Sequence, residues 1–264
     1  MSRTSEAAAG TPVNVICLKW GTRYGVHYVN NLAAGVTRHL RRPHQIHCVT
    51  DDPRGLGADV RPIPFPDNPG VRRGWPDILV KLLLMADGFG GLKGPTLFLD
   101  LDVVIMAGLD VFFDYHPGEY CMIHNWSAGS RALLGHRPPI GNSSVFRFEA
   151  GGSQAVVDTF LDQIAEAEDR SVYNTEQAFM THAMGQVTWW PDSWVRSYKR
   201  HCRPLFPLNH LRTPRPPRDC RVLVFHGVPD PDQAIQGFRG RKPHHGCRPA
   251  PWIQDHWPLP SDHE

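Results

Sequence analysis

The sequence predicts an α/β fold in which an open, mostly parallel mixed sheet is flanked by helices on both faces. Short apolar runs rich in β-branched and aromatic residues alternate with longer segments whose apolar residues recur at helical spacing. In the first half the order reads strand, helix, strand, strand, helix, strand, which favours parallel pairing through crossover helices. With 264 residues, of which 41% are hydrophobic and 20% charged, the chain is long enough to bury the core of such a domain.

The first half supplies four strands and two helices. The first helix is indicated by Tyr28, Leu32, Val36 and Leu40, which recur on one face. The second has a proline near its start, an apolar stripe, and a glycine at its end. The strands are expected at 13–18, 45–50, 59–63 and in the run ending at Leu99, and the helices at 24–40 and 75–88.

The second half is more mixed and richer in proline. Strands are expected at 120–124, 143–148, 187–190 and 222–225, and helices at 152–168 and 175–184. Five prolines make 203–219 irregular. We divide the chain into a disordered tail (1–11), one domain (12–245) and a C-terminal extension (246–264).

Composition excludes several classes of protein. The 28 basic and 26 acidic residues nearly balance, which argues against a nucleic-acid partner. No apolar run approaches the ~20 residues of a membrane span, although association with a membrane surface remains compatible with the sequence. The polar start lacks the pattern of a signal peptide, and the six cysteines are scattered without a C-x-x-C motif. These features predict a cytoplasmic location.

Asp100 and Asp102 are the most informative residues. They lie between two apolar runs, Thr96–Leu99 and Val103–Met106. Ionised carboxylates in an apolar setting need a cation or several donors, and a hard divalent ion is the natural partner. The alternative is that one aspartate caps a turn and the other forms a surface salt bridge. The β-rich apolar flanks favour a metal site.

A second signal is His226, which follows the apolar strand 222–225 and has an imidazole able to bind the same metal. The alternative is a hydrogen-bonded histidine with no metal role. Ligands of open α/β sheets bind beyond the carboxyl ends of the strands. Lys19 and Trp20, at the end of the first strand, are therefore expected to face one crevice with Asp100.

The chain resembles nucleotide-sugar glycosyltransferases of the GT-A (Rossmann-like) fold, nearest in layout to family 8. That family includes glycogenin and bacterial lipopolysaccharide sugar transferases. The resemblance spans about residues 13–245, and its elements come in the family's order. They are the first strand with Thr22-Arg23-Tyr24, the Lys81 helix, the D-x-D strand, Gly141-Asn142-Ser143-Ser144-Val145, Glu176-Gln177, and the His226 strand followed by Lys242-Pro243.

The resemblance implies a role for each matching residue. Asp100 would lie toward the ribose and the metal, with Asp102 a direct metal ligand and His226 the third. Lys81 and Lys242 would lie near the phosphates, although His244 replaces the tryptophan of the family's Lys-Pro-Trp. Asn142 would lie by the donor sugar, and Glu176 and Gln177 beside the donor sugar and the acceptor. Lys19, Trp20 and Tyr24 would line the nucleotide site, where aromatic rings suit a base.

The implied activity is transfer of a sugar, with retention, from a UDP-sugar to a hydroxyl group of a carbohydrate or glycolipid acceptor, with Mn²⁺ or Mg²⁺ bound. Residues 228–245 are expected to close over the diphosphate. Two other hypotheses remain open. A sugar nucleotidyltransferase would share the metal carboxylates, but normally carries a glycine- and basic-rich loop after its first strand. A non-catalytic nucleotide-binding protein would not need Asp100, Asp102 and His226 together.

Overall fold

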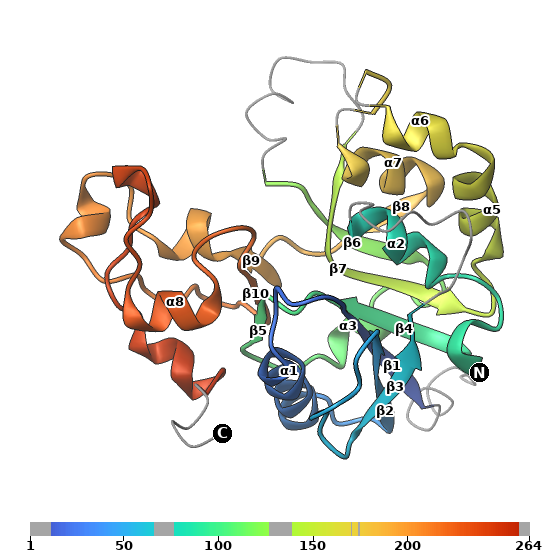
Figure 1. The fold of residues 1–264 in the computed structure, drawn as a ribbon, viewed down its shortest axis with the longest axis horizontal. Helices are drawn as coiled ribbons and strands as arrows, with labels where there is room; N and C mark the ends of the chain where they lie inside the picture. The colour runs from blue at the N-terminus through green and yellow to red at the C-terminus, as the bar shows by residue number, and fades with distance from the viewer. Residues whose placement is uncertain (1–11, 66–76, 127–138, 170, 174, 259–264) are drawn as a thin grey trace, which may run out of the picture.

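A computed structural model describes residues 12–65, 77–126, 139–169, 171–173 and 175–258 (Figure 1). The predicted tail, 1–11, lies outside the described residues. The main feature is a seven-stranded sheet with the order β3-β2-β1-β4-β7-β6-β8. Its parallel part consists of β1 (Val13–Lys19), β2 (His44–Thr50), β3 (Val60–Pro64) and β4 (Gly94–Leu99).

The other half of this sheet is mixed. β7 (Gly141–Ala150) runs antiparallel to β4 and to β6 (Tyr120–His124), and β8 (Val187–Trp189) is parallel to β6. The predicted open, mostly parallel mixed sheet is therefore confirmed.

Helices cover both faces of the sheet (Figure 1). On one face, α1 (Val26–His39) and α3 (Val111–Asp114) belong to the same buried cluster as Val15 and Cys17 of β1. Ile16 lies between Val15 and Cys17 and belongs to a second buried cluster on the other face of the sheet, because side chains alternate along a strand. The helices of that second face are α2 (Asp77–Leu83), α5 (Gln154–Asp162), α6 (Ile164–Glu168) and α7 (Glu176–Ala183).

A second, three-stranded sheet lies beside the first (Figure 1). It has the order β5-β10-β9, formed by β5 (Val103–Ile105), β10 (Val222–Val224) and β9 (Val195–Ser197). β10 is antiparallel to β5 and parallel to β9. Only residues 100–102 separate β4 from β5, so the chain passes from the large sheet to the small one through the aspartate pair.

Two helical predictions need correction. The helix expected at 152–168 is two helices, because Gln163 leaves the helical conformation with φ −122° and ψ 34°. The helix expected to reach Gly88 ends at Leu83 and continues as turns. Residues 228–245, which are expected to close over the diphosphate, include the helix α8 (Pro231–Gln236). The remaining helical turns are Phe89–Gly91, Tyr198–Cys202, Leu208–His210, Pro243–His245 and Pro251–Asp255.

The C-terminal segment is integrated into the core. Ala234 and Ile235 of α8 are buried, and the Tyr28 hydroxyl donates to Asp232 Oδ1 at 3.0 Å. Beyond residue 245, Ile253 and Trp257 are fully buried in the same cluster. The described part of the predicted C-terminal extension therefore packs into the same core as the residues before it.

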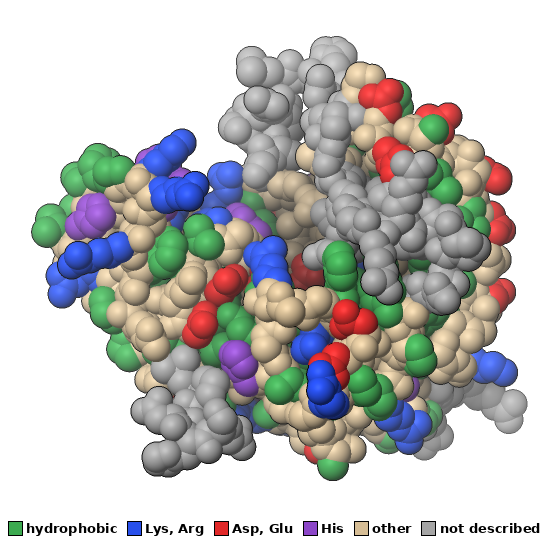
Figure 2. All heavy atoms as spheres, in the orientation of Figure 1, with side chains coloured by type: hydrophobic (Ala, Val, Ile, Leu, Met, Phe, Trp, Pro, Cys, Tyr) green, Lys and Arg blue, Asp and Glu red, His purple; other side chains and the backbone are tan. Residues whose placement is uncertain are grey.

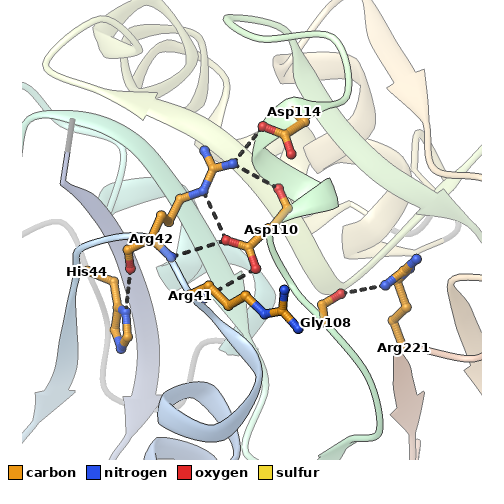
Figure 3. A network of polar contacts seen from close by, with 7 residues as sticks. All are labelled: Arg41, Arg42, His44, Gly108, Asp110, Asp114 and Arg221. Atoms are coloured by element: carbon orange, nitrogen blue, oxygen red, sulfur yellow. Dashed lines mark hydrogen bonds and ion pairs between the residues drawn. The ribbon is translucent and has the colours of Figure 1, made fainter. Parts of the chain in front are cut away.

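A polar network joins the segment between α1 and β2 to the segment that follows β5 (Figure 3). The Asp110 carboxylate accepts the backbone N–H groups of Arg41 and Arg42, both at 3.2 Å. The Arg42 guanidinium also reaches Asp114, at 2.6 Å. Close by, Arg221 donates to the Gly108 carbonyl at 2.8 Å. In the described part of the chain, no helix is long and apolar enough to span a bilayer.

Candidate active site

A cavity of about 540 Å³ opens at the carboxyl ends of β1 and β4, where the two sheets meet. Its walls come from the turn after β1, from α2, from the β4–β5 connection, from β7, from α7 and from the exit of β10. The structure thus brings together most of the residues predicted from sequence. Those that line it are Trp20, Tyr24, Lys81, Asp100, Asp102, Asn142, Gln177 and His226.

Of the predicted residues whose side chains the structure describes, Lys19 and Lys242 do not line this cavity. Lys19 is buried at the end of β1, opposite Thr50 of β2. Lys242 is exposed at the start of a short helical turn in the C-terminal segment. Glu176 begins α7, but its side chain lies outside the described part of the structure.

Lys81 is held against Asp100. Its side chain is only 4% exposed, and its Nζ lies 2.6 Å from Asp100 Oδ1. The ammonium also donates to the Ser143 carbonyl at 3.3 Å and lies over the Phe98 ring at 4.8 Å. A buried lysine needs such partners, so Lys81 holds Asp100 in place and neutralises it.

The negative charge of Asp102 is less well compensated than that of Asp100. Its Oδ2 accepts a hydrogen bond from the Tyr24 hydroxyl at 3.3 Å. Burial, and then repulsion from Asp100, raise the pKa of Asp102 to about 8. The cavity therefore contains a carboxyl group whose ionised form needs a further positive charge.

His226 is presented by the exit of β10. Its Nε2 lies 2.6 Å from Ser197 Oγ, and its ring stacks on Trp126 with 5.4 Å between ring centres. Burial, and then repulsion from Lys199 and Arg200, lower its pKa to about 4. The imidazole is therefore neutral near pH 7, which is the form that binds metal ions.

The opposite wall offers amides. Asn142 is buried, and its Oδ1 accepts the Ser144 N–H at 3.0 Å. Gln177 extends from the first turn of α7, and its Oε1 accepts from Asn125 Nδ2 at 2.5 Å. The hydrogen bond from Asn125 thus fixes the position of the Gln177 carbonyl oxygen.

The donor set suits a divalent cation. Two carboxylates and a neutral imidazole are ligand types that Mn²⁺ accepts. Within the described residues, however, no three His, Cys, Asp or Glu side chains are already gathered at metal-binding distances. The Lys81–Asp100 and Ser197–His226 contacts occupy two of the three expected ligands.

Two neighbouring residues were not predicted. Ser197 holds His226, and it lies on β9, a strand too short to show a sequence pattern. Asp230 precedes α8 and belongs to the same electrostatic cluster as Asp102 and Arg23. A sequence signal for Asp230 was available, because Asp230, Pro231 and Gln233 form a capping box with proline at the start of the helix.

Similar folds occur among solved glycosyltransferase structures. A crystal structure of an active-site mutant of LgtC matches with a TM-score of 0.58 and 14% identity, covering 83% of this chain and 89% of that one. The galactosyltransferase LgtC in complex with donor and acceptor sugar analogues matches with a TM-score of 0.54 and 14% identity, covering 83% and 88%. GlyE from Streptococcus pneumoniae matches at 0.51 and 13%, covering 83% and 56%.

No protein-family model and no curated protein sequence matches the chain. At these identities, the structural matches establish the shared fold. They confirm the GT-A-like architecture predicted from the ordered motifs.

Proposed function

We propose that this chain is a metal-dependent glycosyltransferase that moves a sugar from a nucleotide-sugar donor, UDP-linked in our hypothesis, to a hydroxyl group of an acceptor. The observation that carries the proposal is the position of Asp100 and Asp102. They lie in a cavity at the carboxyl edge of the sheet, together with Lys81, Gln177 and His226. Ligands of open α/β sheets bind at this edge.

The residues of the cavity divide into a nucleotide side and a sugar side. Trp20 and Tyr24, in the turn after β1, offer aromatic surfaces for the base. Asp100, Asp102 and His226 would hold the Mn²⁺ or Mg²⁺. When bound, the metal supplies positive charge that stabilises the departing diphosphate.

Gln177 and Asn142 form the sugar side. Their amides suit hydrogen bonds with sugar hydroxyl groups. We propose retention of configuration, with the Gln177 carbonyl oxygen facing the positive charge that develops at the anomeric carbon. Asn125 fixes that oxygen at 2.5 Å, and this holds the dipole in place before the reaction begins.

The proposed acceptor is a carbohydrate or a glycolipid. A glycolipid head group lies at a membrane surface, and an enzyme acting on it benefits from peripheral association. Leu205 and Leu211 are 83% and 70% exposed, and lie in a segment rich in arginine. Apolar side chains beside basic ones favour binding to an anionic membrane surface.

A thermal-shift panel of nucleotide sugars, with and without Mn²⁺, tests the proposal. We expect a UDP-sugar and Mn²⁺ together to raise the melting temperature more than either alone, because ligands that bind the native state stabilise it. Asp102→Asn preserves shape and removes a ligand charge, so it should abolish the metal-dependent part of the shift.

Product analysis then separates the alternatives. Metal-dependent release of UDP from a UDP-sugar supports transfer or its hydrolytic side reaction. Formation of a sugar nucleotide from a nucleoside triphosphate and a sugar phosphate supports a nucleotidyltransferase. Binding with neither reaction supports a non-catalytic protein. Full activity in EDTA contradicts the metal-dependent mechanism.

A further inference from the structure

We infer that Lys199 binds the phosphate groups of the ligand in this cavity, at a place that the sequence motifs assign to Lys242. The inference rests on the proposed function, in which the ligand is a nucleoside diphosphate sugar. Lys199 lies in the helical turn Tyr198–Cys202 directly after β9.

The topology of the small sheet brings Lys199 to the metal-binding edge. β9 and β10 are parallel, with Ser197 paired with Val224, so both strands end at the same edge. β10 continues into His226 and Gly227, which line the cavity. On the other side of β10, the Phe225 N–H donates to the Asp102 carbonyl at 2.9 Å. The chain segments at Lys199, His226 and Asp102 thus meet at one edge.

Two atomic contacts join the segment of Lys199 to the segment of His226. The Ser197 hydroxyl lies 2.6 Å from His226 Nε2, so the ends of β9 and β10 are joined. A Cβ atom built on Gly227 would lie 2.9 Å from Lys199 Nζ. The ammonium therefore lies against the backbone of a residue that lines the cavity, in space that glycine leaves open.

Asp102 and Asp230 are near enough to act on the charge of Lys199, but neither lies within ion-pair distance of it. Among the described residues, no ion pair within 4.0 Å includes Lys199, whereas Lys81 is paired with Asp100. Burial, and then repulsion from Arg203, lower the pKa of Lys199. A partly buried ammonium without a carboxylate partner is an arrangement that an anionic ligand stabilises.

Lys242 is placed differently. It is exposed and precedes the turn Pro243–His245, whose backbone is tied to the buried Asn209 side chain by a 3.0 Å hydrogen bond to the Pro243 carbonyl. Neither lysine is part of the cavity lining itself, but Lys199 lies against Gly227, which lines the cavity. The helix α8 lies between His226 and Lys242 in sequence.

The test measures affinity by calorimetry for UDP, UMP and uridine in Mn²⁺, using the wild type, Lys199→Met and Lys199→Arg. We expect Lys199→Met to weaken UDP binding about tenfold or more, since a charge-assisted hydrogen bond is lost. The loss for UMP should be smaller and uridine should be unaffected. Lys199→Arg keeps the charge and should recover part of the affinity for UDP.

Two further variants sharpen the comparison. Lys93→Met removes an exposed lysine outside the cavity and should bind UDP like the wild type. Lys242→Met should also bind UDP nearly as tightly as the wild type. The assignment from the sequence motif instead predicts that Lys242→Met binds UDP more weakly than Lys199→Met. Melting temperatures of all variants without ligand show whether the fold is intact.

The outcomes distinguish this inference from the proposed function. If the wild type binds UDP but Lys199→Met binds it equally well, or loses UDP and uridine alike, the phosphate role of Lys199 is overturned and the proposed function stands. If the wild type binds no nucleoside diphosphate of any base, both are overturned.

Discussion

The amide of Gln177 depends on a neighbour for its orientation. Asn125 Nδ2 donates to Gln177 Oε1, and Gln177 lies on the side of the cavity assigned to the sugar. Gln177→Ala should therefore reduce the rate of transfer by about one hundredfold or more, which is the usual effect of removing one group that stabilises transition-state charge. The affinity for UDP should remain nearly unchanged. Steady-state rates and calorimetric UDP affinities measure the two effects separately.

Asn125→Ala provides the matched comparison. It leaves the Gln177 side chain in place but frees it to rotate, so we expect a smaller reduction in rate, roughly tenfold, with the UDP affinity again preserved. If Gln177→Ala lost UDP binding in proportion to transfer, its assignment to the sugar side would be wrong.

His47 makes stability depend on pH. It is 4% exposed in β2, and burial, then repulsion from Arg61, lower its pKa to about 4. The unfolded chain, with a histidine pKa near ~6.5, binds the proton more readily than the folded chain. The stability contributed by neutral His47 is therefore present above pH ~6.5 and is lost progressively as the pH falls toward ~4, by about 2 kcal/mol at pH 5.

Urea unfolding at a series of pH values measures this dependence. His47→Gln should flatten the profile between pH 5 and 7, whereas His244→Gln, which removes an exposed imidazole, should leave it unchanged. An unchanged slope in a folded His47→Gln protein would show that other groups dominate acid destabilisation.

The limits of sequence interpretation are clear at single residues. Trp20 and Lys19 were both expected in the cavity because they end the first strand. Side chains alternate along a strand, so only one of two neighbours faces a given side, and it is Trp20 that lines the cavity. The partner Ser197 depends on a tertiary contact from a distant segment, and no local pattern indicates it.

At the scale of elements, the start of β2 and the segment after β5 are joined by Asp110. Its burial alone would raise its pKa, but hydrogen bonds from the Arg41 and Arg42 backbone and from the Arg42 side chain hold the pKa below its usual value. The folded state therefore favours ionised Asp110. This contribution is present above pH ~4 and is lost as the pH falls below that value.

Asp110→Ala should destabilise the protein by about 1–3 kcal/mol, because it leaves two backbone N–H groups and Arg42 without their acceptor. Asp114→Ala is the control, since Asp114 is 56% exposed and only its pair with Arg42 is lost. Thermal unfolding at pH 7 measures both. Equal effects of the two substitutions would contradict the central role of Asp110.

The long, apolar elements were predictable and the short ones were not. The strand expected at 120–124 is β6, in which four apolar residues are followed by His124. β9 is three residues with Arg196 at its centre, and it forms only because β10 supplies a parallel partner. The break at Gln163 has no glycine or proline to mark it. Such features depend on tertiary packing, which local patterns do not encode.

At the scale of the molecule, the near-neutral composition conceals an uneven distribution of charge. No Asp or Glu occurs between Asp192 and Asp219, or between Asp232 and Asp255, while both stretches carry several arginines. The two stretches lie together, since Asn209 donates to the Pro243 and Gly246 carbonyls. Figure 2 shows blue, purple and green side chains on the lobe at the left, and red ones mainly at the right.

This basic lobe also carries exposed apolar side chains. Leu205, Phe206, Leu208 and Leu211 are four of the seven large hydrophobic residues exposed in the described part of the chain. Exposed leucines beside arginines are expected to insert shallowly into an anionic bilayer, with each basic residue near the surface contributing about 1 kcal/mol at low ionic strength. We therefore predict binding to vesicles containing phosphatidylglycerol, and little binding to pure phosphatidylcholine.

Co-sedimentation with vesicles measures this binding. The double variant Leu205→Ser and Leu211→Ser should bind several-fold more weakly, because the apolar part of the interaction is lost while the charge remains. Leu161→Ser with Val172→Ser removes two exposed apolar side chains from the acidic side and should bind like the wild type. Increasing salt should weaken wild-type binding, since it screens the arginines. If both double variants bind as the wild type does, the lobe does not dock on membranes and its apolar residues serve another contact.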